Sequence, residues 1–193
     1  MAIIDKPSDY FNTKLYTGTG SELAVTGVGF QPDWIWFKQR DAIRSHALVD
    51  SVRGRSKVVF SDLTNPEETS AASTNDLVSF DSDGFTVGTT SVSGSFNTSS
   101  GSHVAWNWKA NGAGSANTTG SINSTVSVNT TSGFSIVKWS GTSATGTIGH
   151  GLGSVPKTVW VKSLANAEGM YTYWQPLGND KQLLMSSTSA QGT

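Results

Sequence analysis

The strongest pattern along the chain is a run of apolar residues that occurs twice. Residues 29–38 read GFQPDWIWFK, and residues 153–162 read GSVPKTVWVK. In each run a proline precedes β-branched and aromatic residues, which suits the start of a strand because proline has no N–H to give to the ladder. In residues 34–37 both alternating faces are apolar, which is typical of a central strand covered on both sides. The pattern therefore predicts strands at about 33–38 and 157–163.

The correspondence extends to the flanking segments. Residues 10–18 resemble 133–141 at an offset of 123 (134 − 11), and residues 54–60 resemble 178–184 at an offset of 124 (181 − 57). A period of roughly 120 residues is too long for a solenoid unit, so each copy is interpreted as a whole domain. We expect a first β-unit over 1–110, a Gly/Ala/Asn/Ser linker over 111–120, and a second, incomplete β-unit over 121–193.

Other segments indicate the same class of structure. Asp83-Gly84 lies between alternating apolar residues and predicts a β-hairpin over 77–88, since glycine supplies the positive φ of the turn. No helical periodicity is sustained, and short strands between Gly-rich turns are typical of sandwiches and jelly rolls. The sequence predicts an all-β chain, with an antiparallel jelly-roll or β-sandwich domain followed by a second, partial copy. Five side chains are expected inside the first unit: Trp36, Phe80, Phe85, Trp106 and Trp108.

Composition narrows the class of protein. Charged residues make up 14% of the 193 residues, the net charge is −1, and there is no cysteine. Abundant Trp and Phe exclude a disordered chain, and a near-neutral charge argues against a nucleic-acid partner. The absence of cysteine excludes a disulfide framework and cysteine-ligated zinc. Because the N-terminal residues contain no long apolar segment, we expect neither a signal peptide nor membrane insertion.

No cluster of residues in the sequence indicates catalysis. His46, Asp50 and Ser51 could in principle form a Ser/His/Asp site, but nothing around them marks a nucleophile elbow. Residues 81–84 begin like a calcium loop, yet the twelfth position holds Val92 instead of the glutamate of an EF-hand. A hairpin turn is the favoured interpretation, and a lectin-like calcium site assembled from distant loops is the alternative. We expect no enzyme activity, no catalytic residue, no cofactor and no metal.

The aromatic residues are the candidate contacts. Tyr171, Tyr173 and Trp174 alternate beside polar residues, and exposed aromatic rings can cover the apolar C–H face of a sugar. They are the candidate glycan or partner contact, with core or interface packing as the alternative. Four other tryptophans fit core positions: Trp36, Trp106, Trp108 and Trp160.

Several segments, taken together and in order, resemble a known family. They are residues 29–38, His46 with the DSVRG segment at 50–54, residues 80–88, and the VAWNWK segment at 104–109. The set resembles a repeated virion-protein domain of tailed phages of marine bacteria, especially cyanophages. Members of that family look like concanavalin/laminin-G-type jelly rolls and often occur in tandem along tail-fibre-like proteins. The resemblance covers residues 10–109 closely and 119–186 as a second, partial copy.

The resemblance implies a virion structural protein of tail-fibre or appendage type that is made in the host cytoplasm. Its expected partners are copies of itself, in a trimer or a ring, and other virion proteins. A host receptor or surface glycan is a further expected partner. Two other functions remain open from the sequence: a capsid decoration protein, and the carbohydrate-binding module of an enzyme. A glycosidase would need paired carboxylates across a groove, whereas the acidic residues here are scarce and lie mostly in loops.

The second copy lacks counterparts of the hairpin 77–88 and of the closing strand 103–109. Half a sandwich leaves an apolar face and an unpaired edge. Either a longer chain or a neighbouring subunit would cover them. In both cases four residues of the second copy should be less buried than their counterparts in the first. The residues are Val159, Val161, Leu183 and Leu184, compared with Ile35, Phe37, Val59 and Phe60.

Overall fold

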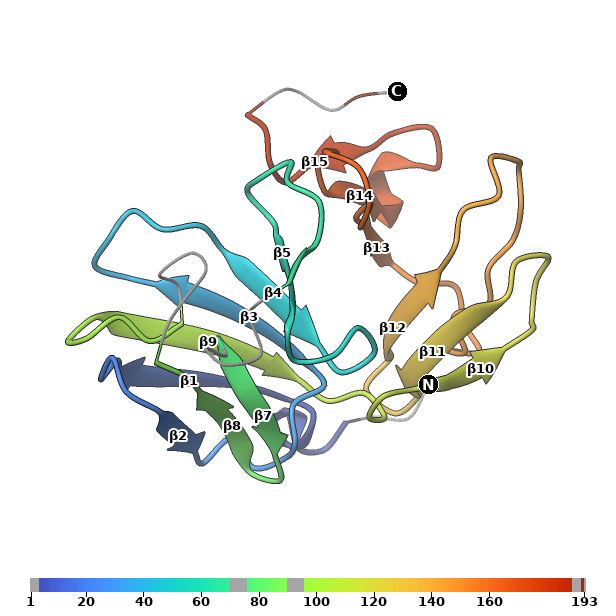
Figure 1. Cartoon of the computed structure of the whole chain (residues 1–193). Coiled ribbons are helices and arrows are strands. Elements are labelled where there is room, and N and C mark those ends of the chain that lie inside the picture. Colours follow the sequence, from blue (N-terminus) through green and yellow to red (C-terminus); the bar gives the residue numbers. More distant parts are fainter. Residues whose placement is uncertain (1–3, 70–75, 90–95, 189–191, 193) are drawn as a thin grey trace.

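The protein is an all-β chain in the computed structural model, which describes residues 4–69, 76–89, 96–188 and 192. Within these residues the strands form antiparallel sheets, and the helical elements are two short 3-10 turns, η1 (Pro7–Asp9) and η2 (Gln175–Leu177) (Figure 1). The predicted all-β, sandwich-type class is confirmed. A jelly-roll topology and a second copy of the domain stay predictions.

Two sheets make up the first unit. The larger has the order β1-β9-β3-β4-β5-β6 and the smaller has the order β2-β8-β7. The strands of the larger sheet are β1 (Phe11–Thr17), β9 (Ser102–Trp108), β3 (Trp34–Gln39), β4 (Ala47–Asp50), β5 (Lys57–Phe60) and β6 (Glu68–Thr69). The strands of the smaller sheet are β2 (Leu23–Thr26), β8 (Gly84–Val87) and β7 (Leu77–Asp81).

The main hydrophobic core lies between these two sheets. Ile35 and Phe37 of β3 are completely buried, as are Leu77 and Phe85 of the smaller sheet. Burying a large apolar side chain contributes about 1.5–3 kcal/mol, so this layer dominates the stability of the first unit. Phe96 is also completely buried. The sequence did not indicate this, because Phe96 lies among Ser, Thr, Gly and Asn.

The predicted hairpin is confirmed. β7 and β8 pair from Leu77 opposite Val87 to Asp81 opposite Gly84. Gly84 has φ +151°, and a Cβ atom there would lie 2.0 Å from the carbonyl oxygen of Val25. Only glycine therefore fits the position at which the hairpin approaches β2.

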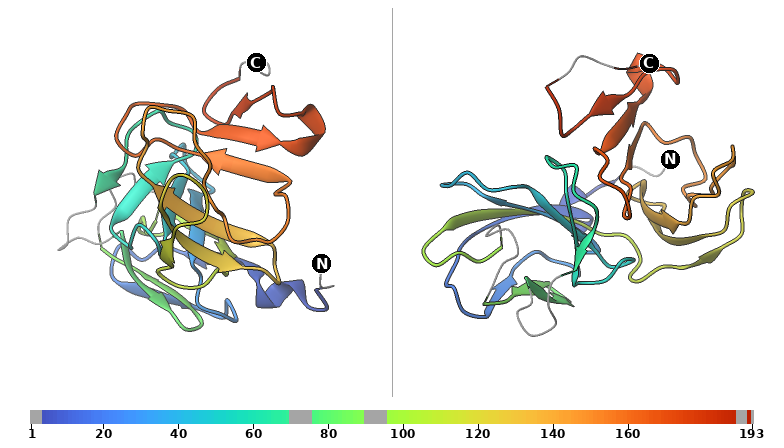
Figure 2. Two further views of the ribbon diagram at one scale, coloured as in Figure 1. Left: turned by 90° about the vertical axis from the view of Figure 1, so that its right-hand side faces the viewer. Right: turned by 45° about the horizontal axis from the view of Figure 1, so that its top comes forward.

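The prediction that β3 is covered on both faces is also confirmed. Ile35 and Phe37 point into the main core. On the other face, Trp34 and Trp36 pack against a second cluster that contains Leu48, Val59 and Met170. Met170 belongs to the second unit, so the first sheet lies between the smaller sheet and the second unit (Figure 2).

The prediction for the interior needs one correction. Phe85 is buried in the sandwich core and Phe80 packs against it. Trp36, Trp106 and Trp108 lie on the opposite face of the six-stranded sheet and are half-buried.

The core-facing residues of β9 are His103, Ala105 and Asn107, each completely buried. The alternation of β9 identified two faces correctly. It could not tell which face lies inside the sandwich, because both faces are covered.

Two three-stranded sheets make up the second unit. One has the order β10-β11-β12 and the other the order β13-β14-β15. Their strands are β10 (Ser115–Asn117), β11 (Ser124–Asn129), β12 (Phe134–Trp139), β13 (Thr158–Val161), β14 (Tyr171–Trp174) and β15 (Leu183–Leu184). β10 falls within the expected linker 111–120, so part of that segment is a strand of the second unit.

The connection between the units is held by a buried carboxylate. Asp33 precedes β3 and is 3% exposed. Its two oxygens accept the backbone N–H groups of Ala110, at 2.7 Å, and Gly112, at 3.0 Å. The Ser51 hydroxyl donates to the Gly112 carbonyl at 2.6 Å. These bonds fix the direction in which the chain leaves β9.

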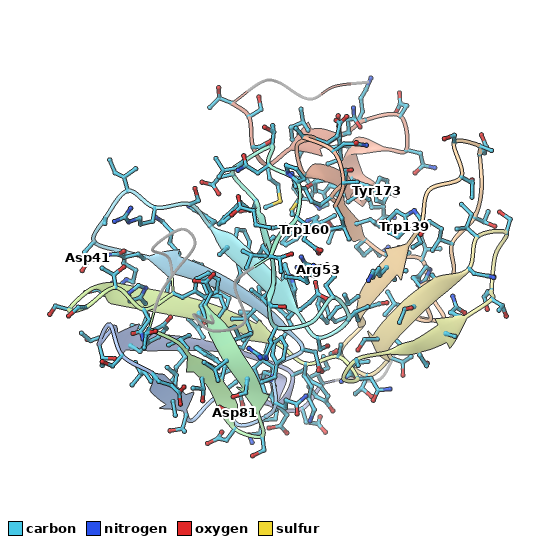
Figure 3. All side chains as sticks on the ribbon, viewed as in Figure 1. Asp41, Arg53, Asp81, Trp139, Trp160 and Tyr173 are labelled. Carbon is cyan, nitrogen blue, oxygen red and sulfur yellow. The ribbon has the colours of Figure 1, made fainter. Side chains whose placement is uncertain are left out.

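A buried ion pair holds the turn after β4. The Arg53 guanidinium lies 2.5 Å from Asp50 and 3.2 Å from Glu67, and it also donates to the Leu48 carbonyl at 3.1 Å (Figure 3). The Arg53 and Asp50 side chains are only 7% and 6% exposed. Removing one member of such a pair leaves the other charge buried and unpaired.

We therefore predict that Arg53→Met lowers the free energy of unfolding by about 3–5 kcal/mol. Urea denaturation of the purified chain measures this loss. Arg44→Met is the matched control, since Arg44 is exposed, and it should change stability by less than about 0.5 kcal/mol. Equal, small effects of the two substitutions would contradict a structural role for the pair.

Candidate functional site

Aromatic rings from both units meet on the outer face of the six-stranded sheet. The ring centroid of Trp34 lies 4.5 Å from that of Trp108, 5.4 Å from that of Trp160 and 5.9 Å from that of Phe134. Trp36 also contacts Trp160, at 5.7 Å between centroids. In Figure 3, Trp160 lies between β13 and the six-stranded sheet. This seam joins the two units. Trp160 was expected at a core position, but it is 37% exposed, because its ring lies at the border of the two units and not inside a sandwich.

The sheet β13–β15 pairs in the same register as β3–β5 at one constant offset. Trp34 lies opposite Asp50, and Thr158 lies opposite Trp174, so both partners move by 124 (158 − 34, 174 − 50). The other residue pairs of the two ladders also shift by 124.

One side-chain contact also recurs at this offset. Lys38 donates to the Arg44 carbonyl, and Lys162 donates to the Glu168 carbonyl. The repeated sequence therefore forms the same local structure twice.

The two sheets differ in what covers them. In β3–β5 the six core-facing residues are at most 2% exposed: Ile35, Phe37, Ala47, Val49, Val58 and Phe60. Five of their counterparts at offset 124 are paired strand residues on one face of the second sheet, which we call the open face: Val159, Val161, Tyr171, Tyr173 and Leu184. The sixth counterpart, Gln182, directly precedes β15 and adds a polar side chain to this face. Val159 is 38% exposed, and the other five are partly exposed. Among the residues that the structure describes, no strand lies over this face as β2–β8–β7 lies over the first.

The prediction of unequal burial is confirmed. Val159, Val161, Leu183 and Leu184 are all partly exposed or exposed. Their counterparts Ile35, Phe37, Val59 and Phe60 are at most 4% exposed.

A residue of β12 is likewise partly exposed although its counterpart in the first unit packs against the core. Trp139 is 36% exposed, and at offset 123 (139 − 16) it corresponds to Tyr16. Tyr16 packs against the main core and donates its hydroxyl to the Phe96 carbonyl at 2.5 Å. The sequence contained the signal for Trp139, since the two segments align, but the prediction of contact residues did not use it.

The three predicted contact residues do not form one platform. Tyr171 and Tyr173 lie on the open face, and their hydroxyls donate to Glu168 at 3.3 Å and to Asn179 at 3.2 Å. Trp174 projects from the opposite face of β14, where it lies opposite Thr158 and is 51% exposed. Strand alternation separates Trp174 from the tyrosines, so the surface available for contact is the open face with the two tyrosines.

The residues considered for a Ser/His/Asp site have other partners. Asp50 binds Arg53, and Ser51 donates to Gly112. His46 packs beside Trp36, with ring centroids 6.2 Å apart, and burial lowers the pKa of its imidazole. Each of the three therefore has a structural partner outside the group.

The carboxylates of the predicted hairpin turn also have partners. Asp81 accepts the hydroxyls of Ser79 and Thr86, at 2.6 and 2.7 Å. Asp83 accepts the backbone N–H groups of Gly29, at 2.6 Å, and Gly27, at 3.0 Å. Within residues 4–69, 76–89, 96–188 and 192, no group of three or more His, Cys, Asp or Glu residues could hold a metal ion. These bonds account for Asp81 and Asp83 as turn residues.

Two pockets lie at the borders of the second unit. One of about 240 Å³ is lined by Tyr10, Phe11, Trp108 and Phe134 at the seam. The other, of about 700 Å³, lies among the Gly-rich loops at 117–120 and 147–156. Neither pocket is lined by Asp or Glu, and His150 is the one histidine among their lining residues.

The comparison with protein families gives one match. The family described as "Domain of unknown function (DUF7483)" matches residues 6–193. The chain belongs to this family. The match spans both units, so the open face lies within the family's domain. No curated protein and no solved structure matches the chain.

No helix in the described part of the chain is long and apolar enough to cross a membrane.

The contacts of Asp83 predict a pH dependence of the hairpin. Hydrogen bonds from the N–H groups of Gly29 and Gly27 lower the pKa of Asp83 below its ordinary value of 3.8. Because these bonds favour the charged form, the contact should persist below the ordinary pKa and be lost only as the pH falls through the lowered value. A pH titration of the Gly29 amide proton by NMR should therefore show a midpoint below 3.8. A midpoint at or above 3.8 would contradict the geometry, and Asp83→Asn should abolish the titration.

Proposed function

We propose that this chain is a structural protein of a phage virion, of tail-fibre or appendage type. The open face carries this proposal. The open face corresponds in register to a buried core, but its side chains are partly exposed. Exposed apolar side chains gathered on one face are typical of a surface that contacts another protein. The resemblance of residues 10–109 to a repeated virion-protein domain supports the same assignment.

The chemistry of the site agrees with a role in assembly. The open face consists of three aliphatic side chains, two tyrosines and one glutamine and carries no charge, and a lack of charge with aromatic residues is typical of an interface centre. The proposal gives the chain no catalytic role and no cofactor. Its partners are other virion proteins and further copies of itself. Attachment to a host receptor is a further role of such an appendage.

The proposal predicts that the chain is a stoichiometric component of phage particles. Mass spectrometry should detect it in density-purified particles of the phage that encodes it. Gold-labelled antibodies against the chain should mark the tail or another appendage. Labelling spread over the head would favour a capsid decoration protein instead. Absence from purified particles, with abundance in the infected-cell lysate, would contradict the proposal.

A second candidate function is binding of a surface glycan, and the exposure of Trp174 favours it. An indole that is 51% exposed presents an apolar face on which a sugar ring can stack. Under this candidate, a glycan array probed with the purified chain gives a positive signal that Trp174→Ala weakens about five- to tenfold. Trp139→Ala, which removes an exposed tryptophan from a different sheet, is the matched control and should leave the signal unchanged. An array without signal, or equal losses in the two variants, would contradict glycan binding at Trp174.

A further inference from the structure

The free edges of β12 and β13 lie where the first unit contains a strand. In the first unit, β9 pairs with β1 on one side and β3 on the other. At the two offsets of the repeat, β12 corresponds to β1 and β13 corresponds to β3. β12 and β13 are each the last strand of their sheet. No described strand occupies the position between them that β9 takes in the first unit.

The backbone of β13 is oriented to receive such a strand. The N–H of Gln175 donates to the Lys157 carbonyl at 2.9 Å, as that of Ser51 donates to Asp33 at 2.8 Å. Bonded and non-bonded pairs alternate in an antiparallel ladder, so the N–H and C=O groups of Thr158 and Trp160 point away from β14. The equivalent groups of Trp34 and Trp36 face Trp108 and Trp106 of β9.

The aromatic contacts also match. In the first unit the β9 tryptophans connect the other two strands, with Trp108 4.7 Å from Phe11 and Trp106 5.7 Å from Trp36. Phe134 and Trp160 are the counterparts of Phe11 and Trp36. Both contact the single ring of Trp34, which belongs to the first unit. Trp108 also contacts Phe134, and Trp36 also contacts Trp160, so rings of the first unit contact both strands, as the β9 tryptophans contact β1 and β3.

The charge around these edges has one sign. The sequence holds no Asp or Glu between Asp83 and Glu168, while Lys138 and Lys157 flank the two edges and are exposed. Lys138 corresponds at offset 123 (138 − 15) to Leu15, which lies opposite Val104. A partner residue at the position of Val104 would therefore lie beside the exposed Lys138. A carboxylate there is complementary.

We propose that an extended strand of another polypeptide chain pairs with the free edges of β12 and β13. The strand alternates like β9 and carries an acidic residue opposite Lys138. Pairing satisfies the outward N–H and C=O groups and joins the two sheets of the second unit, a mode of recognition known as β-augmentation. The proposal rests on the proposed function and deepens it, since it names a class of partner for the second unit.

The test uses two synthetic peptides as probes. One has the sequence of residues 101–110, GSHVAWNWKA, and the other carries Val104→Glu within it. On titration into the isotope-labelled chain, both should shift amide signals of β12 and β13 and slow hydrogen exchange at Thr158 and Trp160. At low salt the acidic peptide should bind about two- to fivefold more tightly, as an exposed ion pair allows. Lys138→Ala should remove that difference.

Matched variants distinguish strand pairing from nonspecific hydrophobic binding of the peptide. Thr158→Pro removes an outward N–H and should abolish the shifts. Thr158→Val, which keeps the N–H and removes only the hydroxyl, should retain them. A peptide of the same composition with the alternation scrambled should not bind. Circular dichroism confirms that each variant is folded.

Three outcomes would overturn the proposal. The first is no shift of amide signals with either peptide at about 1 mM, which would place any dissociation constant above that concentration. The second is a set of shifts centred on β1 or another strand. The third is a dimer of the chain that pairs through β13 and excludes the peptides. Because the experiment uses the isolated chain, its failure leaves the location in the virion unaffected. Absence of the chain from virions would leave the peptide result unaffected in turn.

Discussion

An apolar face of a β-sheet has to be covered, and both faces of β3 are apolar. Its residues alternate between Ile35 and Phe37 on one side and Trp34 and Trp36 on the other. The smaller sheet covers the first pair, and the second unit covers the second pair through Met170 and Trp160. The arrangement of the first sheet, the smaller sheet and the second unit follows from this one strand, since a side chain of either kind left in water would lose about 1.5–3 kcal/mol.

The second unit repeats the strand pairing of β3–β5, but no described strand packs over its sheet as β2, β8 and β7 pack over the first. The registers of β3–β5 and β13–β15 agree residue by residue at an offset of 124, so the local sequence specifies the ladder in both places. One face of the second sheet meets the aromatic seam. The other face, with Val159 and Tyr173, corresponds in register to the core-facing side of β3–β5, but its side chains are partly exposed. This difference is the observation on which the proposed role in assembly rests.

Much of this structure could be predicted from the sequence, for identifiable reasons. The hairpin at 77–88 follows from Asp-Gly between alternating residues. The incomplete burial of Val159 agrees with the lack, within the described residues, of a counterpart of the hairpin and of β9 in the second unit. The inward face of β9 could not be predicted, because Ala105 and Asn107 are less apolar than the tryptophans beside them. Nor could the burial of Phe96, whose neighbours are polar. The separation of Trp174 from Tyr171 and Tyr173 is a consequence of strand alternation that the candidate group ignored.

The central claim is that β3–β5 and β13–β15 pair in the same register, but only β3–β5 has a second sheet packed over its apolar face. Native-state hydrogen exchange tests this claim most directly. The amides of Ile35 and Val159 occupy equivalent places in their ladders, opposite Val49 and Tyr173. Because local stability depends on buried apolar contacts, the account predicts that the Val159 amide exchanges at least ~100-fold faster than that of Ile35 in the isolated chain. Equal protection of the two amides, within about threefold, would contradict it.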